Sequence, residues 1–283
     1  MNDLSHSAGS ADPSDPSGPS EASGSAGLPG SAGSAGSSPS AGPSDAPRPA
    51  QLTAGLARVE DRIAAACASA GRDRGDVTLI VVTKTYPASD VRILAGLGVR
   101  HVAENRDQDA APKAAACADL PLSWHFVGQL QTNKARSVVG YADHVHSVDR
   151  LRLVTSLSHA ATAADKRLGC LVQVALDAGS GDRGERGGVA PDAVGPLADA
   201  IAAAEGLRLD GVMTVAPLTG AYAGQPRAAF DRLMEISSRL RETHPTATMV
   251  SAGMSQDLDE AVAAGATHVR VGTAVLGVRP GLG

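Results

Sequence analysis

The stretch Thr78-Leu79-Ile80-Val81-Val82-Thr83-Lys84-Thr85 is apolar and mostly β-branched, and it leads into a lysine. It lacks the alternation of polar and apolar residues, which predicts a strand buried on both faces, as in a parallel sheet covered by helices. An ammonium group at the end of such a strand is costly to remove from water. A dehydrated, partly neutral Lys84 could form a Schiff base with an aldehyde. The alternative is that Lys84 has already reached the surface and is solvated there.

Seven more apolar runs follow, separated by helical patterns or loops. They span residues 101–105, 124–128, 144–148, 171–176, 209–215, 248–253 and 268–272. Strands that alternate with helices predict a parallel sheet. Eight strands in about 230 residues favour an α/β fold with a single closed (β/α)8 barrel of the TIM type. An open dinucleotide-binding sheet is less consistent with the sequence, because no Gly-x-Gly-x-x-Gly motif follows the first strand.

The composition indicates where the folded domain begins and which classes of ligand are excluded. Residues 1–50 are almost wholly Ser, Gly, Ala, Pro and Asp, which predicts a disordered tail before a barrel at 51–283. A formal charge of -5 and 2% aromatic residues argue against nucleic acid as a partner. The apolar runs are too short to span a membrane. Three scattered cysteines indicate buried thiols in a reducing cytoplasm.

Candidate site residues gather where the predicted strands end, because barrel sites form at the C-terminal ends of the strands. Two small, hydroxyl-bearing loops, 251–255 and 272–274, follow the seventh and eighth strands, where barrels often hold phosphate. Ser255 is also placed to cap the helix that follows it, and Asn105 could cap the helix that follows the second predicted strand. Arg270 lies inside an apolar strand and needs either an ion pair or a polar cavity. His125 is expected to be a satisfied core histidine.

An ordered set of motifs resembles a known family. The motifs are Val82-Thr83-Lys84-Thr85, Glu104-Asn105 with Gln108, Trp124-His125-Phe126-Val127-Gly128, Leu130-Gln131-Thr132-Asn133-Lys134, Ser147-Val148-Asp149, Gln173-Val174, Ser251-Ala252-Gly253-Met254-Ser255 with Asp257, and Val269-Arg270-Val271-Gly272-Thr273-Ala274. Each motif alone is weak, but their order over residues 52–280 is specific. Together they resemble the YggS/PROSC family of pyridoxal phosphate homeostasis proteins.

The resemblance implies an alanine-racemase N-terminal-type barrel that binds pyridoxal 5'-phosphate (PLP), with no metal and no catalytic residues. The implied cofactor-binding residues are Lys84, Asn105, Ser251, Ser255, Arg270, Gly272 and Thr273. Lys84 would carry the Schiff base, Arg270 would face the pyridine nitrogen, and Asn105 would lie beside the ring. The two serines and the backbone of Gly272 and Thr273 would hold the phosphate.

The implied function is a non-catalytic carrier that stores PLP in the cytoplasm and limits its free concentration. Apoenzymes that use PLP would be its partners, and a monomer is expected. The alternative is a racemase-like enzyme acting on amino acids. The C-terminal β-domain of such racemases is not expected, because the sequence ends at Gly283. Four residues depart from the family pattern: Ala103, Arg106, Ala175 and Arg186, the last in place of a loop lysine.

Overall fold

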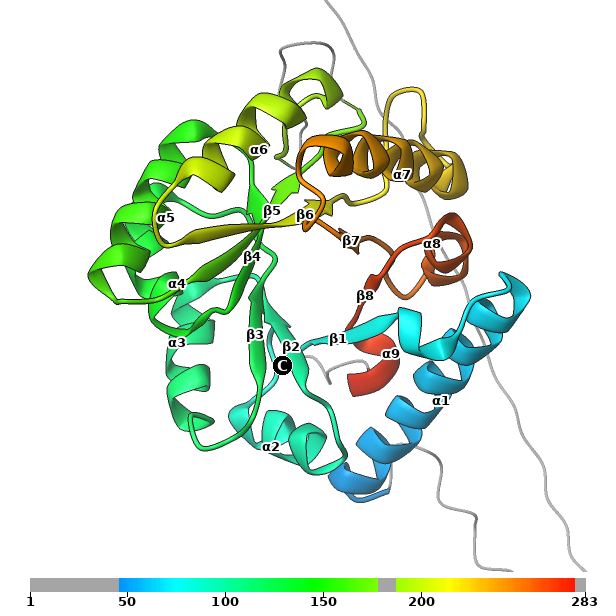
Figure 1. The fold of residues 1–283 in the computed structure, drawn as a ribbon. Helices are drawn as coiled ribbons and strands as arrows, with labels where there is room; N and C mark the ends of the chain where they lie inside the picture. The colour runs from blue at the N-terminus through cyan, green and yellow to red at the C-terminus, as the bar shows by residue number, and fades with distance from the viewer. Residues whose placement is uncertain (1–45, 178–186, 278–283) are drawn as a thin grey trace, which may run out of the picture. The chain divides into compact units, whose positions relative to one another are not determined.

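The computed structural model describes residues 46–177 and 187–277 (Figure 1). Most of the predicted tail, and Arg186, lie outside these ranges. Within the described residues, eight parallel strands close into a barrel in which β1 pairs with both β2 and β8. The strands are β1 Thr78–Val82, β2 His101–Glu104, β3 Ser123–Phe126, β4 His144–Val148, β5 Leu168–Gln173, β6 Leu207–Met213, β7 Met249–Ser251 and β8 His268–Val271. The predicted (β/α)8 barrel is confirmed.

Helices cover the outside of the barrel (Figure 1). They are α1 Arg48–Ser69, α2 Ala88–Gly96, α3 Asp107–Ala116, α4 Ala135–Tyr141, α5 Leu151–Ala163, α6 Val194–Ala203, α7 Pro226–Thr243, α8 Leu258–Ala264 and the short α9 Thr273–Leu276. Each presents an apolar face to the strands. In α1 the buried residues include Leu52, Val59 and Ile63, at the spacing that one face of a helix requires. No helix in the described ranges is long and apolar enough to cross a bilayer.

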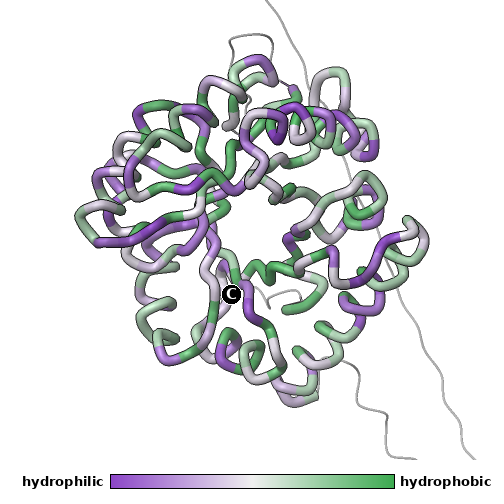
Figure 2. Tube along the Cα trace, viewed as in Figure 1, coloured by the Kyte–Doolittle hydropathy of each residue, from purple (hydrophilic) through white to green (hydrophobic). Residues whose placement is uncertain are grey.

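Two apolar layers between strands and helices form most of the core. One contains Leu79 and Val81 of β1, and the other contains Val172 of β5 with Phe230 of α7. The strands also carry hydrophilic residues (Figure 2). His125, His146 and Arg270 are buried on β3, β4 and β8. The interior of this barrel is therefore partly polar.

Several boundaries differ from the sequence-based predictions. Helix α1 begins at Arg48, inside the stretch assigned to the tail, where Arg48 NH2 lies 2.6 Å from Asp90 Oδ2. Helix α8 begins at Leu258, so Ser255 is not its N-cap. Instead, Asp257 precedes the helix and its carboxylate accepts a hydrogen bond from Met254 N at 2.6 Å. Strands β5 and β6 begin two or three residues earlier than predicted. The predicted run did not include the beginning of β6, because Arg208 there is charged. In the structure this charge is paired with Asp210 on the same strand.

Candidate functional site

The C-terminal ends of β1 and β8 lie side by side and bring two predicted site segments together. Val81 is in register with Val271, so Lys84 follows one strand and the turn at Gly272 follows its neighbour. A Cβ added to Gly272 would lie 3.1 Å from Val82 O, so the two backbones approach closely there. The N–H groups that begin α9, at Thr273 and Ala274, come directly after this turn, and the first N–H groups of a helix have no acceptor within it.

Lys84 lies two residues beyond β1 and its side chain is exposed. The expectation of a dehydrated amine is therefore wrong, because the strand ends at Val82 and the chain turns outward. The turn is closed by a hydrogen bond from Tyr86 N to Thr83 O at 3.1 Å. Thr85 has a φ of 69°, a left-handed conformation that is strained for a β-branched residue. Such strain is frequent at functional sites.

A buried ion pair packs against the turn that carries Lys84. Lys113 Nζ on α3 lies 2.5 Å from Glu104 Oε1 at the end of β2. The same ammonium donates to Thr83 O at 2.8 Å, and Thr83 Oγ1 donates to Glu104 Oε1 at 2.7 Å. Sequence reasoning missed the role of Lys113. Its spacing of nine residues from Glu104 gave no local pattern, since the contact depends on how α3 packs on the sheet.

Asn105 directly follows β2, next to the turn that carries Lys84, and is half-buried. Its backbone lies close to Gly128, which follows β3: a Cβ added to Gly128 would lie 2.0 Å from Asn105 O. The predicted position of Asn105 beside the mouth of the barrel agrees with the fold. Its predicted contact with a cofactor ring stays a prediction.

Arg270 points into the barrel and is 5% exposed. Within the described residues its guanidinium has neutral partners: it donates to Ser251 Oγ at 2.6 Å and to Thr214 O at 2.8 Å. Burial lowers the pKa of Arg270 to about 10, while Asp257 acts in the opposite direction without forming a salt bridge. The ion pair considered from sequence is absent among these residues, and the polar surroundings are the alternative that the structure supports.

The two serines of the predicted phosphate loop differ in position. Ser251 is the last residue of β7, is fully buried, and contacts both Arg270 and His146. Ser255 lies four residues later in the loop and is half-buried. The structure therefore separates them: Ser251 belongs to the interior network, and Ser255 lies in the loop between β7 and α8.

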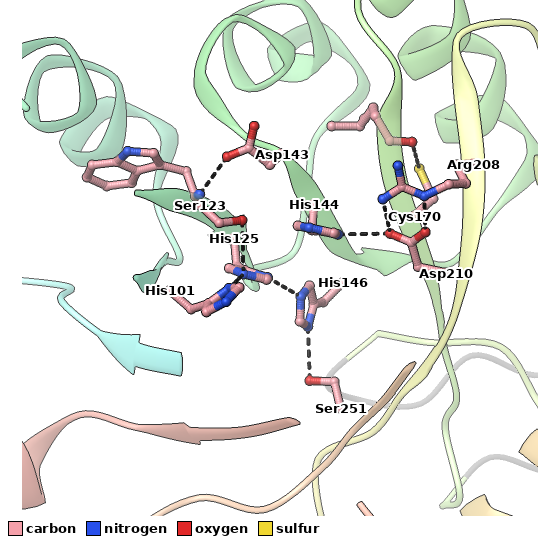
Figure 3. A network of polar contacts seen from close by, with 12 residues as sticks. His101, Ser123, His125, Asp143, His144, His146, Cys170, Arg208, Asp210 and Ser251 are labelled. Atoms are coloured by element: carbon pink, nitrogen blue, oxygen red, sulfur yellow. Dashed lines mark hydrogen bonds and ion pairs between the residues drawn. The ribbon is translucent and has the colours of Figure 1, made fainter. Parts of the chain in front are cut away.

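A line of histidines crosses the interior (Figure 3). His101 Nδ1 lies 3.0 Å from His125 Nε2, and His125 Nδ1 lies 2.8 Å from His146 Nε2. His146 Nδ1 lies 2.9 Å from Ser251 Oγ. Burial lowers the pKa of His125 and His146 well below the ordinary value; neighbouring histidines act in the same direction on both, and Arg270 does so on His146. The expectation that His125 is a satisfied core histidine is confirmed, but its link to Ser251 was not foreseen.

Metal binding has no structural support in the described part of the chain, since no group of three or more His, Cys, Asp or Glu side chains there could hold an ion. The cysteines at 67, 117 and 170 are free and buried. The arrangement instead offers an accessible amine, a turn with backbone N–H groups, and a buried guanidinium. This set suits a ligand with an aldehyde, an anionic group and a hydrogen-bond acceptor.

Comparisons with known proteins agree with this arrangement. Residues 55–280 match the model of the alanine racemase N-terminal domain. The pyridoxal phosphate homeostasis protein of Mycobacterium tuberculosis is 44% identical over 248 residues, covering 82% of this chain and 94% of that protein. The Escherichia coli K12 protein of the same name is 36% identical over 228 residues, covering 79% and 95%.

Among solved structures, PipY of Synechococcus elongatus PCC7942 with PLP bound has a TM-score of 0.68 and 33% identity. The match covers 80% of this chain and all of PipY. The family implied by the sequence motifs is thus confirmed. The chain belongs to the alanine racemase N-terminal domain family, within the group of relatives named pyridoxal phosphate homeostasis proteins.

Proposed function

We propose that this protein is a non-catalytic carrier of PLP that binds the cofactor through a Schiff base on Lys84. The observation that carries the proposal is the position of two turns on neighbouring strands. Lys84 follows β1, and Gly272 with Thr273 follows β8, with Val81 and Val271 in register. An amine and an anion-binding turn at adjacent strand ends fit one small ligand that has both an aldehyde and a phosphate.

In this proposal the phosphate is held by Ser255 and by the backbone N–H groups at Gly272 and Thr273. Backbone N–H groups at the beginning of a helix attract anions. We assign Ser251 a different role from the one the sequence suggested, because its hydroxyl is buried and already contacts Arg270 and His146. Ser251 would hold Arg270, and Asn105 would lie beside the cofactor ring.

Arg270 would face the pyridine nitrogen. A guanidinium that is 5% exposed and has neutral partners can donate to one more acceptor. The donor set therefore fits PLP, whose ring nitrogen is such an acceptor. PLP supplies an aldehyde that condenses with a primary amine.

The exposure of Lys84 changes the physical argument for its reactivity. A buried strand end was expected to dehydrate the amine, but the side chain is exposed. Proximity can promote the reaction in place of dehydration. A phosphate held at the neighbouring strand raises the local concentration of the aldehyde near Lys84, and oriented reactants gain a large rate advantage. The same exposure lets the amine exchange its cargo with solvent, which suits a carrier.

The choice of carrier over enzyme also depends on Arg270. Catalysis with PLP normally uses a carboxylate that keeps the ring nitrogen protonated. A guanidinium at that position remains protonated itself and donates to the nitrogen instead. We therefore propose no racemase-like turnover, and we propose that the carrier acts as a cytoplasmic monomer that supplies apoenzymes.

Absorption spectroscopy of the full chain mixed with PLP tests the assignment. We expect the purified protein to gain a Schiff base band, and borohydride reduction followed by peptide mapping to place the adduct on Lys84. The Lys84→Ala protein should lose both. Lys166→Ala is the matched control, because Lys166 is a lysine at the opposite end of the barrel, near the start of β5. A Lys84→Ala protein that retains the full band would refute the assignment.

Three further measurements test the non-catalytic role, the delivery of PLP and the oligomeric state. Incubation of the PLP-loaded protein with L-alanine in D2O should give no exchange of the α-proton at a catalytic rate; rapid exchange would favour the racemase-like alternative. Transfer of PLP from the loaded protein to an apoenzyme, followed by the recovered activity of that enzyme, tests delivery. Light scattering tests the monomer.

A further inference from the structure

The histidine file, defined as His101, His125 and His146, connects one end of the barrel to the candidate site (Figure 3). The three rings come from β2, β3 and β4, and the file reaches Ser251 on β7 across the interior. Ser251 Oγ then accepts from Arg270 on β8. His125 is 1% exposed and His146 is 0% exposed, whereas His101 is half-buried and can reach solvent.

The three rings of the file are neutral at neutral pH, because burial opposes their protonation. A neutral imidazole has one nitrogen that donates and one that accepts. Each contact in the file needs one donor and one acceptor, so the tautomer of one ring fixes the tautomer of the next. Only two arrangements satisfy every contact, and they run in opposite directions.

Arg270 decides between the two directions. A guanidinium can only donate, so Ser251 Oγ must accept from it. If the Ser251 hydroxyl donates to His146 Nδ1, every ring nitrogen of the two buried histidines, His125 and His146, has a partner. In the reverse direction the hydroxyl proton needs a third partner, and none is present among the described residues. Buried donors are rarely left unpaired, which favours the first direction, with protons on Nε2 of His146 and His125.

We propose that His146, backed by His125 and His101, is a positioning residue that turns the Ser251 hydroxyl so that its lone pair faces Arg270. The file thereby fixes the guanidinium that the proposed PLP site uses. This inference rests on the proposed function only in assigning Arg270 to the cofactor. The direction of the hydrogen bonds is a property of the protein itself.

His144 provides a matched control. It lies on the same strand as His146 and stacks on His125, with ring centroids 4.6 Å apart and an interplanar angle of 8°. Its Nδ1, however, contacts Asp210 Oδ2 at 2.8 Å rather than a member of the file. A substitution at His144 should disturb the packing of the interior without reversing or breaking the contacts to Ser251.

The experiment compares the Kd for PLP, the absorption maximum of the bound cofactor and the thermal unfolding midpoint. The variants are His146→Leu, His146→Asn and His144→Asn. We expect His146→Leu to weaken PLP binding about tenfold and to shift the absorption maximum, since it removes the acceptor that orients a contact to a charged group. His146→Asn should rescue both, because the Asn Oδ1 can accept from Ser251. His144→Asn should leave both unchanged.

Wild-type affinity in His146→Leu, or an equal loss in His144→Asn, would overturn the positioning role. Nitrogen-15 NMR of the wild-type protein gives a second test that needs neither PLP nor a variant. Protons on Nε2 of His125 and His146 support the inference, and protons on Nδ1 overturn it. If the wild-type protein binds no PLP, the proposed function fails, while the NMR result still decides the direction of the file.

Discussion

Lys113 Nζ lies 2.5 Å from Glu104 Oε1, and both side chains are buried against the turn that carries Lys84. Lys113 also donates to Thr83 O, and Thr83 immediately precedes Lys84. The ion pair therefore fixes the backbone from which the proposed PLP-binding amine projects. The other oxygen of the carboxylate, Glu104 Oε2, is buried and has no partner among the described residues, so Lys113 provides most of the compensation for this charge.

Removing one member of this pair should be strongly destabilising. We expect Lys113→Met to lower the free energy of unfolding by about 3–5 kcal/mol, because it leaves a buried carboxylate without its counter-charge. Urea unfolding followed by circular dichroism measures the change. The double variant Lys113→Met with Glu104→Gln should recover part of the loss.

The control for this prediction is the exposed ion pair of Arg92 with Asp119, in which Arg92 NH2 lies 2.7 Å from Asp119 Oδ1. Solvent screens exposed ion pairs, so Arg92→Met should change the free energy of unfolding little. An equal effect of Lys113→Met and Arg92→Met would contradict the importance of burial.

Gly128 should not tolerate a side chain. A Cβ there would lie 2.0 Å from Asn105 O and 2.7 Å from Asn105 C, and backbone atoms cannot move aside easily. We expect Gly128→Ala to lower the free energy of unfolding by about 1–3 kcal/mol and to weaken PLP binding by displacing Asn105. The matched control is Gly140→Ala in α4, where a Cβ meets nothing within 4 Å. Alanine there should stabilise the helix by up to about 1 kcal/mol. Equal stabilities of the two variants would show that the close approach is not real.

The sequence predicts the barrel well because its strands are buried on both faces, and burial leaves long apolar runs such as Leu79 to Val82. The exposure of Lys84 was not predictable from the same run, since it depends on where β1 ends and on the left-handed Thr85. Ser251 and Ser255 look alike in sequence, and only the end of β7 separates an interior hydroxyl from a loop hydroxyl.

The histidine file could not be predicted from the sequence for a different reason. Its members come from separate strands, and the contact to Ser251 crosses the closed barrel. The clue available in the sequence was that His144 and His146 share one face of an expected strand, since side chains on a strand alternate. That pattern indicates a polar interior but does not identify the partner of either ring.

Replacing Thr85 with glycine should stabilise the protein. Its φ of 69° places a β-branched side chain in the left-handed region, which costs about 1–2 kcal/mol. We expect Thr85→Gly to raise the free energy of unfolding by up to about 1 kcal/mol, since glycine relieves the strain but loses more entropy on folding. Asp165 is the control, with a φ of 49° and a side chain that tolerates this conformation better. Asp165→Gly should gain less, and a larger gain at Asp165 would argue that Thr85 is not strained.

Stability should fall between pH 7 and pH 5.5 because the buried His125 and His146 and the half-buried His268 resist protonation. Burial lowers the pKa of His268 to about 4, with nearby His101, His144 and Arg270 acting in the same direction and Asp210 opposing them. It lowers those of His125 and His146 well below the ordinary value. An unfolded histidine has a pKa of about 6.5, so above this pH neither state binds the extra protons and the full stability is present.

As the pH falls below about 6.5, the unfolded chain takes up protons that the folded protein does not, and this favours unfolding. We expect a loss of about 1 kcal/mol for each of the three histidines by pH 5.5, measured by urea unfolding at the two pH values. His268→Gln should reduce the loss by about 1 kcal/mol, since it removes one of these contributions. His159→Gln should not change it, because His159 is exposed on α5. Equal stability at pH 7 and pH 5.5 would mean that the folded interior accepts these protons as readily as water does, and that the rings are not held neutral.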